Sequence, residues 1–183
     1  MLATLQSRFE QLKIQKEAVT RRFAGVETRY WTAAPGPGEW SLSEIANHLV
    51  LVEQEVIRQL RERSTFARRR RGLREHLGSA AVHIAFRYGF RVKVPLRSVV
   101  PVADLAQDQI FEAWSAVRDE LELCLEQISE DSLDDFVCRH PIAGKLNIKK
   151  TLDLIERHIT HHLRQIERTE KRLGINTTGP NVI

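Results

Sequence analysis

Four stretches of this sequence place apolar residues three or four positions apart, and this spacing constrains the fold more than any other feature. An α-helix completes a turn in about 3.6 residues, so each stretch gathers its apolar side chains along one side. Because such a stripe must be buried against a partner, we expect an all-α protein, a four-helix bundle. The expected helices cover residues from about 2 to 24, 42 to 61, 104 to 128 and 147 to 173.

Residues at the ends of these stretches support the same boundaries. Ser41 is followed three positions later by Glu44, a capping-box pattern in which two side chains satisfy free backbone N–H groups at a helix start. Asp104 and Asn147 are residues that can cap the third and fourth helices. Gly174 is typical of a position just beyond a helix end.

The segments between the stripes are less regular. Residues 61–100 mix an arginine run, glycines and β-formers, and we expect an irregular excursion between the second and third helices. The stretch CRHPIAGKLN, residues 138–147, is expected to be a Pro/Gly connector. The chain of 183 residues fits a single domain, which we place at 1–175, with a loose C-terminal tail at 176–183.

Bulk composition narrows the class of protein. Hydrophobic residues make up 42% and charged residues 28%, an ordinary globular balance. No apolar run approaches the roughly 20 residues of a membrane span, and the N-terminus lacks an apolar signal core, so we expect a cytoplasmic protein without a membrane partner. Two cysteines are too few for a disulfide framework. We expect Cys124 to serve packing, and Cys138 has no evident activating base except His140.

The stretch HITHHLRQIE, residues 158–167, carries three histidines on an expected helix. His158 and His162 are four positions apart, which separates them by about 40° around the helix axis, so they share the face that bears the apolar stripe. His161 is rotated toward the flank. Two inward imidazoles at this spacing can present nitrogens to one metal ion.

A third ligand would have to come from a facing helix, and His48 is the candidate. It lies between Ile45 and Val52 on the apolar side of the second helix, where an unpaired imidazole is unfavourable to bury. Three histidines with one open position would form a catalytic type of site, since structural zinc sites fill all four positions with protein. The alternative is that these are buried histidines hydrogen-bonded to backbone or carboxylate groups, and the spacing leaves both open.

The segments EWSLSEIANHLVLVEQE, residues 39–55, and HPIAGKLNIKKTLDLIERHITHHLRQI, residues 140–166, resemble the DinB/YfiT-like superfamily of metal-dependent enzymes. The resemblance implies a four-helix bundle, often a homodimer, in which three histidines hold a divalent metal ion, zinc or nickel. Carried over to this chain, the ligands are His48, His158 and His162. Gln165 matches the glutamine that follows the histidine pair and would support the ligands by hydrogen bonding.

The resemblance also implies a reaction class. Relatives include transferases and isomerases that use low-molecular-weight thiols, and hydrolase activities have been proposed for others. A metal ion with an open position deprotonates a bound thiol and lowers the pKa of bound water to about 7, so either becomes a nucleophile toward a small-molecule substrate. This sequence does not choose between transfer and hydrolysis, and it does not name the substrate.

Several side chains are candidates for supporting roles near the metal. His161 and the carboxylates of Glu44, Glu53 and Glu55 could shuttle protons. The structural interpretation is a cap for Glu44 and solvated helix-surface charges for Glu53 and Glu55. Trp40 could wall the site or pack as a core aromatic beside the cap.

Two other functions compete with a metal-dependent enzyme. Residues 61–76 carry seven arginines and could contact nucleic-acid phosphates, although such a run is more often a solvated loop or a dimer rim. Because of that, we rank nucleic acid below a small molecule as the partner. A metal-stabilised scaffold without turnover is the other alternative. His140 matches the histidine–proline step of the family without a known role, and His76 and His83 receive no assignment.

Overall fold

The computed structural model describes residues 1–62 and 97–175 of the chain. Four long helices dominate these residues, as the sequence predicted, and shorter elements join them. The long helices are α1 (Ala3–Ala24), α3 (Leu42–Arg61), α5 (Gln107–Glu126) and α6 (Ile148–Leu173). The short elements are α2 (Thr28–Trp31), the 3-10 turns η2 (Arg97–Val99) and η3 (Glu130–Ser132), and the strands β1 (Phe136–His140) and β2 (Gly144–Asn147).

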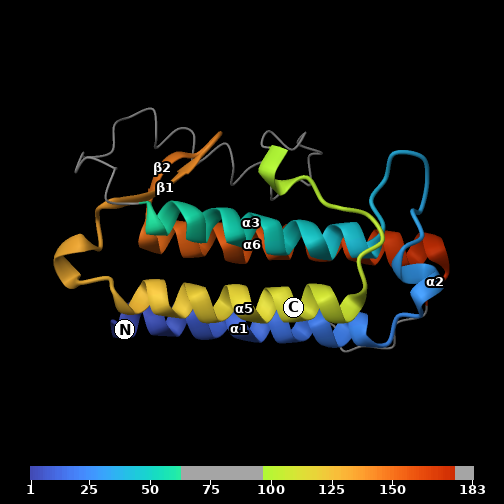
Figure 1. Ribbon diagram of the computed structural model, residues 1–183, viewed down its shortest axis with the longest axis horizontal. Helices are drawn as coiled ribbons and strands as arrows, with labels where there is room; N and C mark the ends of the chain where they lie inside the picture. Colours follow the sequence, from blue (N-terminus) through green and yellow to red (C-terminus); the bar gives the residue numbers. More distant parts are fainter. Residues whose placement is uncertain (63–96, 176–183) are drawn as a thin grey trace.

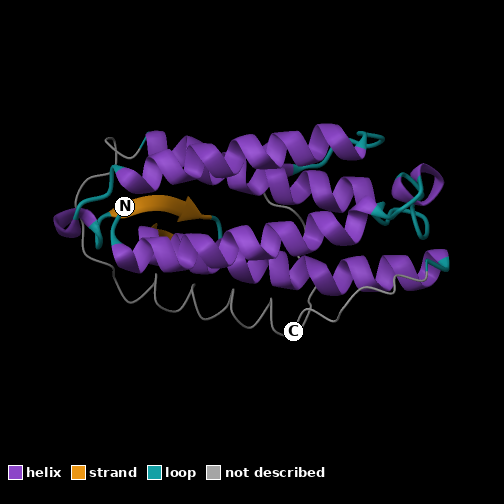
Figure 2. Cartoon of the chain, turned by 90° about the horizontal axis from the view of Figure 1, so that it is seen from below, coloured by secondary structure: helices purple, strands orange, loops and turns teal. Residues whose placement is uncertain are grey.

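The four long helices form a bundle in which each packs against two neighbours. Helix α3 contacts α5 and α6, and α1 contacts the same two helices on the other side. Figure 1 shows the result as two layers, α3 with α6 above and α5 with α1 below, and in the view of Figure 2 the four run side by side along the long axis. One apolar core lies between them, and its largest fully buried side chains include Trp31, Trp114, Phe9, Phe23, Leu49 and Leu121.

Two of the predicted helix starts and one helix end are confirmed. Glu44 N–H donates to Ser41 Oγ over 3.2 Å, and Ser41 N–H donates to the Glu44 carboxylate over 2.8 Å, which completes the capping box. Asn147 caps α6 by accepting a 3.0 Å hydrogen bond from the Lys150 N–H. Gly174 follows the end of α6 with φ of 70°, the left-handed conformation that glycine adopts without steric strain.

The predicted cap of the third helix is wrong. Asp104 lies three residues before the first helical residue and has φ of 61°, so its side chain does not cap α5. The helix begins instead at Gln107, whose side-chain amide donates to the carbonyls of Phe23 and Val26 over 3.1 and 2.9 Å. Contacts to the end of α1 therefore fix this helix start, and no local sequence pattern reports such contacts.

The expected connector at 138–147 is also wrong, because most of it forms an antiparallel hairpin of β1 and β2. Gly144 pairs with His140 at the end of the ladder and has φ of 72°, a conformation that favours glycine in the turn. The N–H of Arg139 donates to Gln59 Oε1 on α3 over 2.7 Å. The hairpin is thus attached to the bundle, and it lies against the α3/α6 layer on the side away from α1 and α5 (Figure 1).

Several predictions concern residues that lie partly or wholly outside the described part of the chain. Most of the excursion at 61–100, most of the arginine run, His76, His83 and the tail at 176–183 lie outside the described residues. The short helix α2, at one end of the bundle in Figure 1, was not predicted. None of the helices in the described part of the chain has the length and apolar character needed to cross a membrane.

Candidate metal centre

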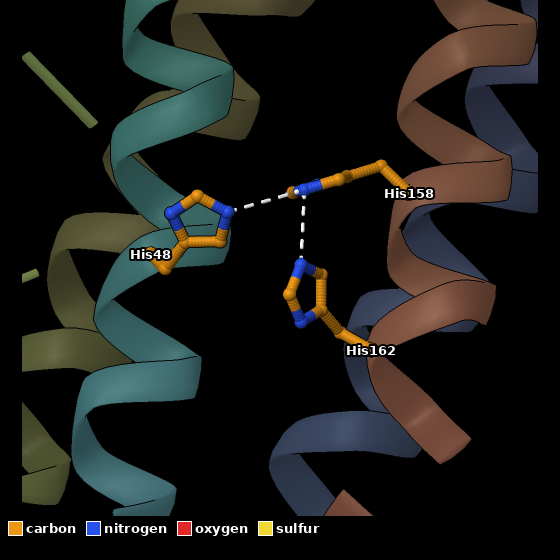
Figure 3. Close-up of side chains that lie close together, drawn as sticks. All are labelled: His48, His158 and His162. Atoms are coloured by element: carbon orange, nitrogen blue, oxygen red, sulfur yellow. Dashed lines mark hydrogen bonds between the residues drawn. The ribbon is translucent and has the colours of Figure 1, made fainter. Parts of the chain in front are cut away.

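Neighbouring helices bring the three predicted histidines together. His48 lies on α3, while His158 and His162 lie one turn apart on α6, and Figure 3 shows the three rings meeting in the space between the two helices. His48 and His162 are buried, and His158 is half-buried. One potential ligand nitrogen from each ring lies within 4.8 Å of the other two. The two separated stretches of sequence therefore meet at one point.

The nitrogen atoms that face one another are the Nε2 atoms. His158 Nε2 lies 3.2 Å from His48 Nε2 and 3.1 Å from His162 Nε2 (Figure 3). Two nitrogen ligands of a tetrahedral zinc ion lie roughly 3.3 Å apart when each bond is about 2.0–2.1 Å. The two separations are close to those that a shared divalent ion requires.

Hydrogen bonds on the far side of two rings fix which nitrogen carries the proton. His48 Nδ1 lies 2.7 Å from the carbonyl oxygen of Val99, and His162 Nδ1 lies 2.8 Å from Oε1 of Gln165. Both partners accept only, so each Nδ1 must donate, and in the neutral ring Nε2 then holds a lone pair. The two lone pairs point toward His158, the orientation that outer hydrogen bonds give to metal-binding histidines.

The surroundings keep these imidazoles uncharged at neutral pH. Burial lowers the pKa of His48, and burial together with the neighbouring histidines lowers the pKa of His158 well below the ordinary value. Burial, followed by the influence of His48, lowers the pKa of His162 to about 3. A neutral imidazole is the form that binds a metal ion, so these rings need not release a net proton near pH 7.

The donor set fits a divalent cation. The Nε2 lone pairs of His48 and His162 converge on Nε2 of His158. Without a cation, three lone pairs at this point would repel one another, so His158 must carry its proton on Nε2. A positive ion at the same point satisfies all three nitrogens at once, and nitrogen ligands of this kind suit zinc, nickel and related ions. Three ligands of this kind would leave one tetrahedral position for a reactant.

The segment that follows η2 is fastened to α3 beside the histidines. Besides the bond from His48 to Val99, Asn47 Oδ1 accepts a 2.9 Å hydrogen bond from the N–H of Val102. Two adjacent residues of α3, Asn47 and His48, therefore hold the two ends of the backbone segment 99–102. Sequence reasoning missed the role of Val99. Every residue has a main-chain carbonyl, so the residue type does not reveal which side chain donates to it.

Trp40 combines the two roles considered for it, because it packs against the core and also lies against the histidine rings. Its ring centroid lies 4.9 Å from that of His48, and it stacks on His162 with centroids 6.4 Å apart and an interplanar angle of 18°. The loop that carries it is fixed to α6, since Arg172 donates to the carbonyl of Pro35 over 3.0 Å and pairs with Glu39. Trp40 therefore reaches the histidines from a loop that is tied to the end of α6.

The other candidates for supporting roles are His161, Glu44, Glu55 and Glu53. The ring of His161 lies on the flank, with its centroid 5.2 Å from that of His162, and Glu44 is the predicted cap. Glu55 accepts from Arg58 and Gln59 and its side chain is only 14% exposed, so it is less solvated than predicted.

The prediction that Glu53 is a solvated surface charge is wrong, because it is only 2% exposed. Its Oε1 accepts hydrogen bonds from Trp114 Nε1 over 3.1 Å and from Arg118 over 2.7 Å, both on α5. The side chain therefore faces α5, and its described hydrogen bonds do not involve the histidines. Sequence periodicity alone did not find this pair, because both partners are charged residues on separate helices.

Both cysteines pack in or against the core. Cys124 is half-buried against the core, in agreement with the packing role predicted for it. Cys138 is buried in β1, and burial raises the pKa of its thiol to about 12. A thiol with so high a pKa stays protonated near pH 7 and is a poor nucleophile.

The fold and the cluster define a class of protein, a four-helix bundle in which two adjacent helices present three histidines to one point. Residues 11–166 match the DinB superfamily, and the chain belongs to that superfamily. Among curated proteins, it is 23% identical over 140 residues to the uncharacterized protein YuaE of Bacillus subtilis (strain 168), a match that spans 76% of this chain and 82% of YuaE.

Solved structures share the fold at low sequence identity. YfiT from Bacillus subtilis, described as a probable metal-dependent hydrolase with an unusual four-helix bundle topology, has a TM-score of 0.63 and 12% identity, with 92% of this chain and 87% of YfiT covered. The four-helix bundle protein TT2238 has a TM-score of 0.59 and 16% identity, with 89% of this chain and 98% of TT2238 covered. At these identities the likeness establishes the fold and not the reaction.

Proposed function

We propose that this protein is a metal-dependent enzyme in which His48, His158 and His162 hold a divalent metal ion, zinc or nickel. The ion would activate a low-molecular-weight thiol or a water molecule for attack on an electrophilic small molecule. The observation that carries the proposal is the convergence of three Nε2 atoms, two of which hold lone pairs because their rings donate through Nδ1. A divalent ion in such a site supplies a nucleophile by lowering the pKa of what it binds.

A metal ion in this site would keep its positive charge and so favour an anionic ligand. The outer hydrogen-bond acceptors of His48 and His162 are a carbonyl and an amide oxygen, and neither carries charge. Arg168, on the same helix, lowers the pKa of His162, so it adds positive potential near this ring. An ion held by three neutral ligands keeps its full charge, so a thiolate or hydroxide is stabilised there over its protonated form.

Metal analysis of the purified protein tests the site itself. We expect about one divalent ion per chain after supplementation, and we expect His162→Ala to lose it. His161→Ala is the matched control, because this neighbouring histidine lies on the flank of α6 and should leave the metal content unchanged. A wild-type protein that holds no zinc, nickel or cobalt after supplementation would remove the basis of the proposal.

A second measurement separates the possible reactions. The metal-loaded protein is incubated with a thiol-reactive electrophile and an ester, each with and without common low-molecular-weight thiols. Transfer predicts metal-dependent consumption of thiol and electrophile together, whereas hydrolysis predicts ester cleavage without a thiol. If the metal raises the melting temperature and no substrate is consumed, the site is a structural support instead of a catalytic centre.

We also propose a homodimer and a cytoplasmic location, both of which rest on the resemblance and on composition. Light scattering coupled to size-exclusion chromatography measures the first directly, and a mass near twice 21.1 kDa would support it. Binding to nucleic acid is not proposed, because most of the arginine run lies outside the described residues.

A further inference from the structure

His140 lies at the end of β1, next to the proline that begins the hairpin turn, and none of the roles above uses it. It is half-buried, and its Nδ1 accepts two main-chain hydrogen bonds, from Ile142 N–H over 3.2 Å and from Ala143 N–H over 3.0 Å. The imidazole therefore stabilises the hairpin turn by accepting hydrogen bonds from two of its backbone N–H groups. A ring fixed in this way has one orientation relative to the hairpin.

These two bonds also determine where the proton of His140 lies. Because Nδ1 accepts twice, it carries no proton, and the neutral ring must carry its hydrogen on Nε2. No further hydrogen bond joins this ring to any residue within 1–62 or 97–175. The Nε2–H group is thus an oriented donor without a partner among those residues.

The hairpin brings this donor to the same side of the bundle as the histidine cluster. Strand β1 packs against both α3 and α6, and in Figure 1 the hairpin and the yellow-green turn η2 lie on the same side of the α3/α6 layer. His48 bonds to Val99 of η2, so η2 reaches the cluster from this side of the layer. His158, the cluster member that is only half-buried, is near enough to His140 to be influenced electrostatically.

We propose that His140 is a substrate-contacting residue whose Nε2–H donates a hydrogen bond to an anion bound at the open position of the metal centre. The proposal rests on the proposed function, since it needs a metal ion on His48, His158 and His162. A fixed neutral donor suits a thiolate or another small anion, because it stabilises the negative charge without offering a proton that neutralises it. The turn hydrogen bonds hold the donor in place before the ligand arrives, so little ordering is needed on binding.

Two conservative variants distinguish the acceptor function of Nδ1 from the donor function of Nε2. In His140→Asn, the side-chain oxygen can take the place of Nδ1 and accept from the N–H groups two and three residues later, as asparagine does in turns. This variant keeps the turn and loses the donor. In His140→Gln, the amide reaches the position of Nε2 and keeps a donor, but the turn loses its acceptor.

The test uses cobalt(II) as the metal and azide as the anion. Cobalt absorption reports both loading and anion binding, so metal content and azide affinity are read from the same sample. We expect His140→Asn to bind one cobalt ion with wild-type affinity, to melt near the wild-type temperature, and to bind azide about tenfold more weakly. Azide affinity in His140→Asn equal to that of the wild type would overturn the proposal, as would a cobalt-loaded wild type that binds no azide.

A second pair of variants keeps the test informative if His140→Asn does not fold. His140→Gln and His140→Met both lack the turn acceptor and have similar length, and they differ in the presence of an amide donor. We expect the glutamine variant to bind azide more tightly than the methionine variant by about the same factor. Equal affinities in this pair would count against the donor role. Loss of cobalt from the wild type would instead contradict the metal site, so the two failures are distinguishable.

Discussion

Helix α3 contributes to two buried polar clusters, one facing α5 and one facing α6. Toward α5, the Glu53 carboxylate meets the Arg118 guanidinium over 2.7 Å, and the two side chains are 2% and 4% exposed. Toward α6, His48 meets His158 and His162, and the pKa of each of the three is lowered, so the rings are neutral near pH 7. The first cluster pairs opposite charges, whereas the second gathers lone pairs and holds no charge.

The difference between these clusters indicates what each is for. A buried charge is tolerated when an opposite charge and hydrogen bonds accompany it, and Glu53 also accepts from Trp114. The opposite charges of Glu53 and Arg118 therefore neutralise each other. The histidine cluster carries no charge of its own, and the Nε2 lone pairs of His48 and His162 both point toward His158. Charge balance distinguishes the Glu53–Arg118 pair from the histidine cluster, which we propose binds a metal ion.

The largest expected effect comes from breaking the charge pair. Arg118→Ala leaves the Glu53 carboxylate buried without its counter-charge, and we expect the free energy of unfolding to fall by about 3–5 kcal/mol. Urea denaturation measures this loss. The metal content of the folded fraction should stay at the wild-type level, because the pair and the histidines lie on different sides of α3.

The matched control replaces both charges. Glu53→Gln combined with Arg118→Met keeps an acceptor for Trp114 and removes the charge on each side, so most of the lost stability should return. If the single and double variants are equally unstable, packing and not charge explains the effect, and the contrast between the two clusters weakens.

Removing the metal ion tests the other cluster. Free metal at about a hundred times its Kd stabilises a protein that binds it only when folded by about 2.7 kcal/mol. We expect chelation to lower the melting temperature of the wild type and of Arg118→Ala by the same free-energy increment. His162→Ala should show no increment, and a response to metal in that variant would indicate binding elsewhere.

The pH dependence of the metal-free protein tests the charge state of the same cluster. The pKa of His162 is about 3 in the folded protein and about 6.5 in an unfolded chain. The unfolded state therefore binds more protons between these values, and the free energy of unfolding should fall as the pH is lowered from about 6.5 toward 3. Urea denaturation at successive pH values measures the slope. His162→Gln should make the slope shallower, and an unchanged slope would contradict the assignment of a neutral buried ring.

The smallest expected effect concerns the outer hydrogen bond of His162. Gln165→Ala removes the acceptor of the Nδ1–H group, and we expect about tenfold weaker metal binding in competition with a coloured chelator. Gln165→Glu retains an acceptor and adds negative charge, so its affinity should equal or exceed that of the wild type. Glu156→Gln, an exposed change on the same helix, is the control and should leave the affinity unchanged.

Sequence patterns predicted the elements that obey local rules. The spacing of apolar residues located α1, α3, α5 and α6, because a helix needs one continuous apolar side to be buried in a bundle. The caps at Ser41 and Asn147 were predictable, since a capping side chain bonds to backbone only three residues away. His158 and His162 were placed on one face for the same reason, as one turn of helix separates them.

The predictions that failed depend on contacts between distant segments. Glu53 has the sequence context of a surface charge, and only the position of Arg118 on another helix makes its burial tolerable. The hairpin at 136–147 is short and marginal by itself, and it gains support from Gln59 on α3. Asp104 is a good capping residue, but the contacts of Gln107 with the end of α1 determine where α5 starts.

By itself, the amino-acid sequence determined that four helices form, where most of them end, and which histidines face inward, because each of these follows from backbone periodicity and from hydrogen bonds over a few residues. Only the tertiary structure decided that His48 and His158 lie 3.2 Å apart, that Val99 and Gln165 orient two of the rings, and that Glu53 is paired inside the core. The physical reason is that these arrangements depend on which helix lies beside α3, and side-chain packing across the whole bundle sets that choice.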